Sequence, residues 1–280
     1  MLDLIQQRLR DYQAKTKADE LNAYKEICQE IALSGLARAG FFQEGVFQGG
    51  TCLRIVHGLD RFSEDLDFVL RDANSDFSWT PYLDSLEEAF KVQGLQLIAV
   101  DRSKADNVVK KAFLKDNSFG QILVLEHPRD RSDPRSIQIK LEVDCHPPGG
   151  STLSSHLIPF PYPFSLVAHD LPSLFAGKCV AILCRSYDKG RDWYDFLWYL
   201  QRHIKPNYAH LRFGLAQARQ VPDQIDADWL RQALASKIDT TDWNAALMDV
   251  RRFLRPGREH QVAEWQPSLF HAMLDLIIPE

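Results

Sequence analysis

The chain has 280 residues, of which 45% are hydrophobic and 25% charged, a composition typical of a globular protein with a substantial core. Its formal net charge of −5 does not indicate a nucleic-acid binder, and its five cysteines form no CxxC pair of the kind found in structural zinc sites. No stretch approaches the roughly 20 apolar residues of a membrane span, and the polar N-terminal segment lacks the apolar core of a secretion signal, so we expect a cytoplasmic protein with no membrane partner.

The first predicted elements are a helix, a short strand and a second helix. Apolar positions at helical spacing predict the first helix over residues 19–39. The short apolar segment Val46-Phe47 then leads into a glycine turn. Cys52–His57 is expected to form the second helix, and Gly58 is expected to end it.

Two strands carry polar side chains on one face. Residues 65–70 begin with alternating polar and apolar residues, which predicts a half-buried strand with the carboxylates of Asp65 and Asp67 on the same face. Alternation over the eight residues 137–144 predicts a second strand with Glu142 on its polar face. Between these two strands we expect a helix near 82–93 and strands near 95–100 and 121–126.

The second half of the chain is predicted to be helical. Residues 147–164 are rich in Pro, Gly and Ser and are expected to form a linker or an extended crossing segment. Asp170 or Ser173 is expected to cap a helix that runs to about Arg185, with Pro172 in its first turn. Further helices are predicted near 192–202, 206–219, 226–236, 241–254 and 267–277.

The pair Asp65 and Asp67 is a candidate metal site. Two carboxylates that project side by side repel each other, and a divalent cation keeps both ionised. Hard oxygen ligands with open coordination positions suit Mg²⁺, which completes its shell with water and substrate phosphates. Taken alone, however, such a pair is common on exposed strands.

The turn Gly49-Gly50-Thr51 adds a candidate phosphate site upstream of the carboxylates. Glycines let backbone N–H groups approach an anion closely, and the N-terminus of a helix favours a phosphate group. A plain strand-to-helix turn needs only one glycine. The glycine pair followed about fifteen residues later by Asp65 and Asp67 therefore favours a site for phosphate and metal.

The run GGTCLR at 49–54, followed by RFSEDLDF at 61–68, resembles the AbiEii/AbiGii toxin family of nucleotidyltransferases related to DNA polymerase beta. That family has three further elements, which this chain matches in order. They are an acidic strand (IKLEV, 139–143), a lysine-bearing helix (GKCVAILCR, 177–185) and an RDxYD segment (KGRDWYD, 189–195). The resemblance spans residues 45–200, and residues 205–280 match nothing specific.

The resemblance implies an α/β (α+β) fold with two parts. Residues 1–164 are expected to form a mixed-sheet nucleotidyltransferase core with flanking N-terminal helices. Residues 165–280 are expected to form a helical domain that contributes Lys178 and Asp195 to the site.

The chemistry of nucleotidyl transfer assigns roles to these residues. Asp65 and Asp67 would hold Mg²⁺, and Glu142 would bind a second metal ion or act as a base, although Lys140 or Asp144 on the same face could serve instead. The resemblance implies that Lys178 contacts phosphate and that Asp195, with Asp192 as the alternative, is a catalytic acid. The residues expected to bind the nucleotide are Gly49, Gly50, Thr51, Arg54, Ser63, Arg191 and Asp192.

The function implied by the resemblance is Mg²⁺-dependent transfer of a nucleoside monophosphate from an NTP to an RNA acceptor, with tRNA favoured. The protein would then be the toxin of a toxin–antitoxin or phage-defence system, with a cognate antitoxin as a partner. Two alternatives stay open: transfer to a small molecule or a protein hydroxyl, for which Ser63 is a candidate, and an inactive nucleotide-binding module.

Overall fold

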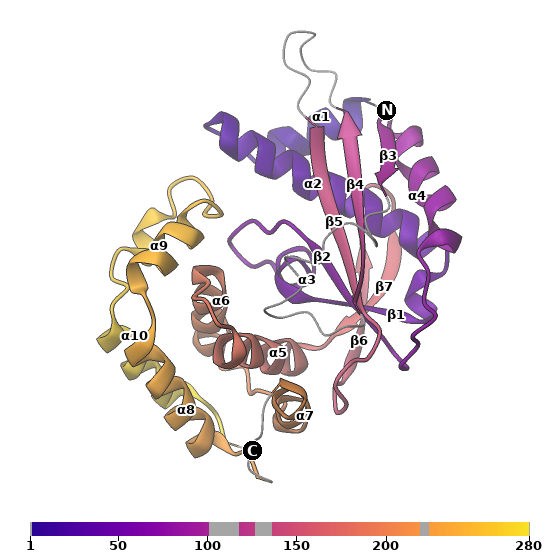
Figure 1. Ribbon diagram of the computed structural model, residues 1–280. Helices are drawn as coiled ribbons and strands as arrows, with labels where there is room; N and C mark the ends of the chain where they lie inside the picture. The colour runs from indigo at the N-terminus through magenta and orange to yellow at the C-terminus, as the bar shows by residue number, and fades with distance from the viewer. Residues whose placement is uncertain (1, 101–117, 127–135, 219–223, 280) are drawn as a thin grey trace. The chain divides into compact units, whose positions relative to one another are not determined.

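The computed structural model describes residues 2–100, 118–126, 136–218 and 224–279 (Figure 1). The chain divides into two compact units. The first, which we call the sheet unit, comprises Met1–Gly58, Phe62–Pro147 and Ser155–Ala168. The second, which we call the helical unit, comprises Leu59–Arg61, Pro148–Ser154 and His169–Glu280. The expectation that 1–164 and 165–280 are separate domains stays a prediction.

A seven-stranded sheet has the order β3-β4-β5-β2-β1-β7-β6. It is mixed, as predicted, because β2 pairs antiparallel with β1 and parallel with β5, while β1 pairs parallel with β7. The central position of β2 places the residues around Asp67 between two neighbouring strands. The strands are β1 (Gly45–Gln48), β2 (Leu66–Leu70), β3 (Gln96–Val100), β4 (Ser118–Glu126), β5 (Ser136–Asp144), β6 (Leu153–Ile158) and β7 (Phe164–His169).

The helices of the sheet unit flank these strands (Figure 1). Thr16 and Asp19 form a reciprocal capping box that starts the long helix α2, and α2 packs against both α4 and β5. Gly58, at φ +71°, ends α3 as predicted. The helices are α1 (Leu2–Asp11), α2 (Lys17–Arg38), the 3₁₀ helix η1 (Phe41–Gln43), α3 (Gly49–His57) and α4 (Thr80–Val92).

The first helix of the helical unit carries Lys178. Asp170 caps this helix, α5, by accepting a hydrogen bond from the backbone N–H of Ser173 at 2.9 Å, as the sequence predicted. Helix α5 packs against α6 and α7, and α6 packs against α9. The helices are α5 (Leu171–Cys184), α6 (Gly190–Gln201), α7 (Tyr208–Ala218), α8 (Ala227–Thr240), α9 (Trp243–Arg251), η3 (Glu259–Val262), α10 (Pro267–Met273) and η4 (Leu274–Leu276).

The segment predicted to be a linker or an extended crossing segment, 147–164, contains strand β6. This strand lies at the end of the sheet and alternates exposed with half-buried positions, so Leu157 is 69% exposed. Only Ile158 of this strand is buried, so the strand lacks the regular apolar face on which its prediction would depend. Helix α1 and strand β7 were also not predicted.

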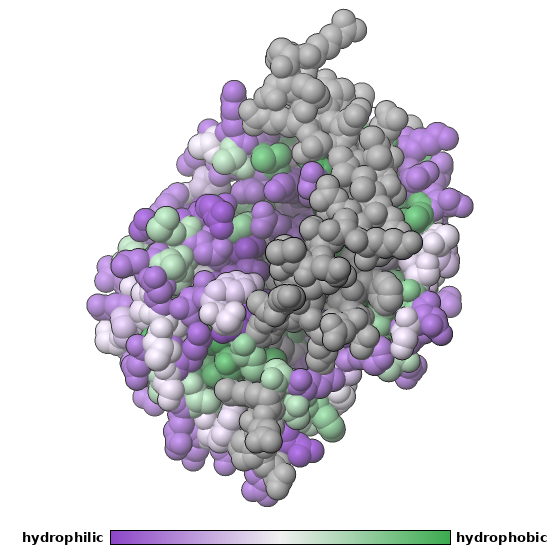
Figure 2. Space-filling model, viewed as in Figure 1, coloured by the Kyte–Doolittle hydropathy of each residue, from purple (hydrophilic) through white to green (hydrophobic). Residues whose placement is uncertain are grey.

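No described helix has both the length and the apolar character that crossing a membrane requires. On the face drawn in Figure 2, hydrophilic residues predominate over the described surface and apolar residues lie between them in smaller areas. That distribution is ordinary, since even soluble monomers expose scattered apolar side chains.

An aromatic cluster around Phe41 supports the strand that carries Asp67. The Phe41 ring is fully buried, with centroids 4.9 Å from Phe68 on β2, 5.2 Å from Tyr82 and 5.4 Å from Trp79. A Cβ atom at Gly45 would lie 2.3 Å from this ring, so the backbone of β1 has room only for glycine there. The cluster thus packs against one side of β1 and β2 and holds both strands in place.

We expect Phe41→Ala to lower the free energy of unfolding by about 3–5 kcal/mol, because a cavity replaces a ring packed on all sides. Urea denaturation followed by circular dichroism measures this change. The matched control is Leu157→Ala, which truncates an exposed apolar side chain and should change stability by less than about 0.5 kcal/mol. A loss below about 1 kcal/mol for Phe41→Ala would contradict the packing described.

Candidate active site

The glycine turn lies directly against one of the paired carboxylates. Strand β1 ends at Gln48, whose register partner on β2 is Asp67, and α3 begins at the next residue, Gly49. Gly49 has φ +78°, and a Cβ atom built on it would lie 2.5 Å from Asp67 Oδ2. Both the backbone conformation and the close contact therefore require glycine at this position.

The loop before β2 is held by hydrogen bonds to its backbone. The Thr51 hydroxyl donates to the carbonyl oxygen of Asp65. The side-chain amide of Gln29 donates to the carbonyl oxygens of Ser63 at 3.1 Å and Glu64 at 2.8 Å. The position of Asp65 is thus fixed through its backbone. The roles of Thr51 and Ser63 in binding nucleotide stay predictions.

Glu142 lies beside Asp67, because these two residues are register partners in the parallel pair of β2 and β5. Glu142 forms an ion pair with Lys140 on the same strand face. Partial burial acts to lower the pKa of Lys140, but the bond to Glu142 and the charges of Asp65 and Asp67 outweigh it and raise that pKa. Lys140 therefore stays charged next to all three carboxylates and neutralises part of their mutual repulsion.

The donor set suits Mg²⁺ through two carboxylates. Among the residues that the structure describes, no group of three His, Cys, Asp or Glu side chains converges to hold a metal. Asp65 and Asp67 stay the predicted ligands, and Glu142 beside them is paired with Lys140. One or two carboxylates completed by water and substrate phosphates is the usual environment of Mg²⁺.

Asp144, the alternative to Glu142, accepts a hydrogen bond from the backbone N–H of His146 at 2.8 Å. Its register partner on β2 is Val69, two residues beyond Asp67. Of the three polar residues considered on β5, Glu142 is thus the register partner of Asp67 and Lys140 interacts with the charges of Asp65 and Asp67.

Arg54, a predicted phosphate contact, bonds to a buried glutamate. Its Nε lies 2.8 Å from the carboxylate of Glu26, and the guanidinium carbon lies 5.3 Å from the centre of the Phe62 ring. Both side chains of the ion pair are largely buried, at 10% and 8% exposure. These contacts join α3 to α2, and a role in binding nucleotide stays a prediction.

In the helical unit, Lys178 binds both predicted aspartates. Its Nζ lies 2.7 Å from Asp192 Oδ1 and 2.7 Å from Asp195 Oδ2. The Asp195 side chain is completely buried and the Lys178 side chain is 12% exposed. The aspartates lie three residues apart on one face of α6, which explains why a single lysine reaches both.

Two arginines that the sequence analysis did not single out complete this cluster. Arg61 makes two hydrogen bonds to Asp195, from Nε at 2.7 Å and Nη2 at 2.6 Å, and is 2% exposed. Arg185 bonds to Asp192. Arg61 is the first residue of the RFSEDLDF motif, and Arg185 follows the last residue of α5. An arginine at such a position is usually solvated, so the sequence did not indicate that either side chain binds a buried aspartate.

The electrostatics of the cluster keep Asp192 ionised. Burial alone would raise the pKa of this carboxyl group, but Lys178, Arg185 and Lys189 outweigh it and lower the pKa well below its usual range. The pKa of Lys189 is lowered, first by burial and then by Arg191 and Arg185. Cations gather here around two buried carboxylates, a setting in which an added anion meets favourable charge.

Arg191, also a predicted phosphate contact, has structural partners. Its Nε lies 3.4 Å from Asp249 Oδ2, and its guanidinium carbon lies 3.9 Å from the centre of the Phe253 ring. These contacts link α6 to the end of α9. A phosphate contact for Arg191 stays a prediction.

The predicted site residues fall into two groups, one in each unit. The catalytic roles assigned to them stay predictions. The sheet unit holds Gly49, Gly50, Thr51, Arg54, Ser63, Asp65, Asp67 and Glu142, and the helical unit holds Lys178, Arg191, Asp192 and Asp195.

Comparisons with known proteins identify a family for the chain and two solved structures with a similar fold. A family model described as "Nucleotidyl transferase AbiEii toxin, Type IV TA system" matches residues 31–270. The solved structure of MenT4, a nucleotidyltransferase toxin from Mycobacterium tuberculosis, is similar with a TM-score of 0.55 at 15% identity, covering 99% of this chain and 89% of that chain. JHP933 from Helicobacter pylori is similar with a TM-score of 0.52 at 16% identity, covering 91% and 90%. No curated protein shows significant sequence similarity.

These comparisons confirm the predicted fold class, a mixed sheet with flanking helices as in nucleotidyltransferase toxins. At this level of identity the two solved structures support the fold alone. The family model, in contrast, covers most of the chain and includes every predicted site residue.

We expect Gly49→Ala to displace Asp67 and to weaken Mn²⁺ or Mg²⁺ binding, measured by calorimetry, by at least about tenfold, because the new methyl group would overlap the carboxylate. Gly58→Ala is the matched control, since Gly58 also has a positive φ but nothing lies within 4 Å of a Cβ atom added to it. Both variants should lose about 1–2 kcal/mol of stability from the left-handed backbone. Equal metal affinity in the two variants would contradict the contact.

We expect Asp192→Asn to lower the free energy of unfolding at neutral pH by about 3 kcal/mol, because it removes one partner of a buried charge cluster. The folded pKa of Asp192 lies below its unfolded value of about 3.9. Its stabilising effect is therefore full above about pH 4 and is lost as the pH falls through the folded pKa. The difference between wild type and variant should shrink below pH 4 in urea titrations.

The control for this measurement is Asp228→Asn, whose side chain is 80% exposed. It should leave both the stability at neutral pH and its acid dependence close to those of the wild type. A constant difference between Asp192→Asn and wild type from pH 7 to pH 2 would contradict the lowered pKa.

Proposed function

The chain belongs to the AbiEii family of nucleotidyltransferase toxins of type IV toxin–antitoxin systems, and on this basis we propose that it transfers a nucleoside monophosphate from an NTP to an RNA acceptor, with tRNA favoured. The observation that carries the proposal is the close approach of the Gly49 turn to Asp67, which sets the turn that we assign to phosphate next to the carboxylates that we assign to the metal. The corresponding cofactor is Mg²⁺, held by Asp65 and Asp67.

The reaction has a simple balance of bonds. A hydroxyl oxygen of the acceptor bonds to the α-phosphorus of the NTP, the bond from that phosphorus to the bridging oxygen breaks, and pyrophosphate leaves. Mg²⁺, when bound, neutralises charge on the triphosphate and on the leaving group. The acceptor hydroxyl must lose its proton, and Glu142 beside Asp67 is the group that we assign to receive it.

The glycine turn supplies the second element of this site. Backbone N–H groups at the start of α3 are available to a phosphate because the first turn of a helix has no intrahelical partners for them. Gly49 has no side chain, so the Asp67 carboxylate lies close to the start of α3 and to these N–H groups. Lys140 adds a positive charge close to the carboxylates.

Lys178 is our candidate for the cation that binds the phosphates of the nucleotide. Its two aspartate partners also receive hydrogen bonds from Arg61 and Arg185, so their charge stays compensated when Lys178 engages a phosphate oxygen. On this proposal, Asp192 and Asp195 position Lys178. The proposed setting is the cytoplasm, where NTP and tRNA are present, with a cognate antitoxin and a role in phage defence.

The test is incubation of the purified protein with Mg²⁺, total tRNA and each labelled NTP in turn. We expect label on tRNA with one or more NTPs and its loss when EDTA is added. Asp67→Asn and Asp65→Asn should each lower the rate at least about a hundredfold, while the free energy of unfolding changes by less than about 1 kcal/mol. The matched control is Asp72→Asn, which removes an exposed aspartate just after β2.

Normal transfer by Asp67→Asn would contradict the metal-site assignment. Label on the protein itself would move the acceptor to a side chain such as Ser63. Label on neither tRNA nor protein, with Mg²⁺ still bound, would instead indicate a different acceptor such as a small molecule. Failure to bind Mg²⁺ would favour the inactive nucleotide-binding module.

A further inference from the structure

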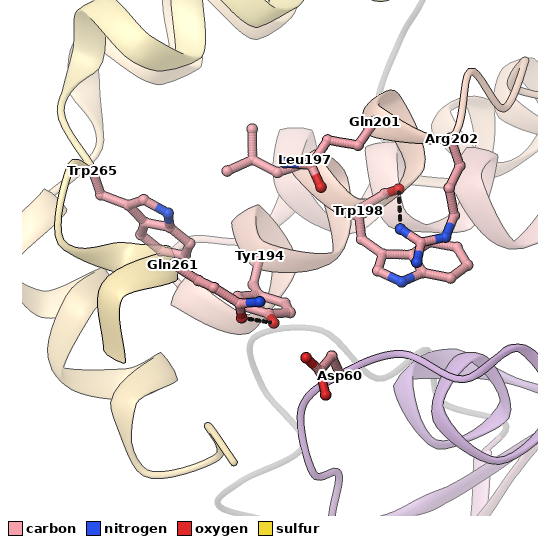
Figure 3. A pocket seen from close by; sticks show the side chains of 8 residues that line it. All are labelled: Asp60, Tyr194, Leu197, Trp198, Gln201, Arg202, Gln261 and Trp265. Atoms are coloured by element: carbon pink, nitrogen blue, oxygen red, sulfur yellow. Dashed lines mark hydrogen bonds between the residues drawn. The ribbon is translucent and has the colours of Figure 1, made fainter. Parts of the chain in front are cut away.

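A cavity of about 230 Å³ lies in the helical unit beside α6 (Figure 3). The protein itself already engages the walls of this cavity. The Arg202 guanidinium carbon lies 3.9 Å from the centre of the Trp198 ring, and the Tyr194 hydroxyl donates to Gln261 Oε1 at 2.6 Å. No residue of the proposed metal site lines the cavity. Support for that site comes instead from the sheet unit, around the loop that carries Asp65.

The two predicted metal ligands differ in how the backbone holds them. Asp67 lies inside β2, where its register partners are Gln48 on β1 and Glu142 on β5. Neighbouring strands therefore fix Asp67 from both sides. Asp65 precedes the first residue of β2, Leu66, and residues 62–65 belong to no helix or strand. The position of Asp65 thus depends on the groups that bind this loop.

Gln29 of α2 binds the loop through both hydrogens of its side-chain amide. Its Nε2 donates to the carbonyl oxygen of Ser63 at 3.1 Å and to that of Glu64 at 2.8 Å. Because a carbonyl oxygen only accepts, only the NH₂ group of the amide can face these two partners. The second carbonyl belongs to the peptide bond that joins Glu64 to Asp65. Gln29 is 1% exposed, so water scarcely competes for these bonds.

The start of the same loop is held by a second residue of α2. Glu26, one turn before Gln29, accepts hydrogen bonds from the Tyr12 hydroxyl at 2.9 Å and from Arg54 Nε at 2.8 Å. The Tyr12 ring stacks on Phe62 with centroids 6.1 Å apart, and the Arg54 guanidinium carbon lies 5.3 Å from the centre of the Phe62 ring. Phe62 is 3% exposed. One face of α2 thus holds the loop at successive points, the last of them directly before Asp65.

Small shifts of this loop matter because of the geometry that the ion requires. Mg²⁺ demands near-ideal octahedral coordination with ligands at about 2.0–2.1 Å. Since the strands fix Asp67, any freedom of residues 62–65 changes the separation of the two carboxylates. Residues that touch no metal but fix its ligands typically change metal affinity by about 10–100-fold when they are replaced.

We propose that Gln29 is a positioning residue for the metal site. It sets the backbone from which Asp65 projects and so keeps that carboxylate within reach of an ion shared with Asp67. From α3, the Thr51 hydroxyl completes the hold by donating to the Asp65 carbonyl oxygen. The inference rests on the metal site of the proposed function and adds to it a residue that touches neither metal nor substrate.

The test compares Gln29→Met with the wild type by calorimetric titration with Mg²⁺ and with Mn²⁺. Methionine has a similar length but no donor. We expect Kd for the metal to rise about tenfold, because Asp65 is no longer held. The matched control is Gln93→Met, the same substitution at a glutamine of the sheet unit that is also 1% exposed and lies at the end of α4. It should leave Kd close to the wild-type value.

The outcomes separate this inference from the metal-site assignment. A wild-type Kd in Gln29→Met, together with lost binding in Asp65→Asn, would overturn the role of Gln29 and leave the metal site in place. Equal weakening in Gln29→Met and Gln93→Met would also overturn that role, because a general loss of stability would then explain both. A wild type that binds neither ion would overturn the metal site and this inference with it.

Two further measurements cover the case in which Gln29→Met does not fold. Gln29→Asn keeps the amide but shortens the side chain by one methylene group, so the amide falls short of the loop, and we again expect a rise in Kd of about tenfold. In a crystal structure of the wild type with Mn²⁺, we expect the ion on Asp65 and Asp67 and the Gln29 amide on the carbonyl oxygens of Ser63 and Glu64. A Gln29 side chain turned away from the loop in that crystal structure would overturn the proposal.

Discussion

The approach of Gly49 to Asp67 is the contact on which the sheet unit depends. Strands β1 and β2 are antiparallel neighbours, so the turn that follows β1 must pass beside the carboxylate on β2. A side chain at Gly49 would occupy the position of Asp67 Oδ2, and the positive φ also favours glycine. The Thr51 hydroxyl then bonds back to the Asp65 carbonyl oxygen. As a result, the glycine turn and both carboxylates are held in position relative to one another. The ring of Phe41 packs against Phe68, the residue that follows Asp67 on β2.

The helical unit is organised by buried charge instead. Placing Asp192 and Asp195 in the interior carries a large desolvation penalty, which is offset only where each carboxylate has cationic partners. Lys178 serves both, and Arg61 and Arg185 serve one each. Asp192 and Asp195 thus share Lys178, and the sequence analysis named both as candidates. Both carboxylates on α6 fix the position of the same ammonium group on α5.

Regular elements were predictable where a periodic pattern and its end signals occurred together. Helix α5 has both, with Asp170 as its cap, and β5 has an alternation of eight residues. Strand β6 has neither, because only its last residue, Ile158, is buried. Arg61 was not predicted as a partner of Asp195, since 134 residues separate them in the chain. The cavity beside Trp198 likewise carries no local signal, because Trp265 reaches it from a distant segment.

The sequence by itself determined the family, the mixed-sheet fold and the candidate metal and phosphate residues, because glycine turns, carboxylate pairs and strand alternation are local patterns. The tertiary structure alone decided what those residues touch. It set Glu142 beside Asp67 and paired it with Lys140, and it joined Arg61 to Asp195. Those contacts depend on how distant segments pack and on which buried charges can be compensated, and no local pattern in a single sequence records either.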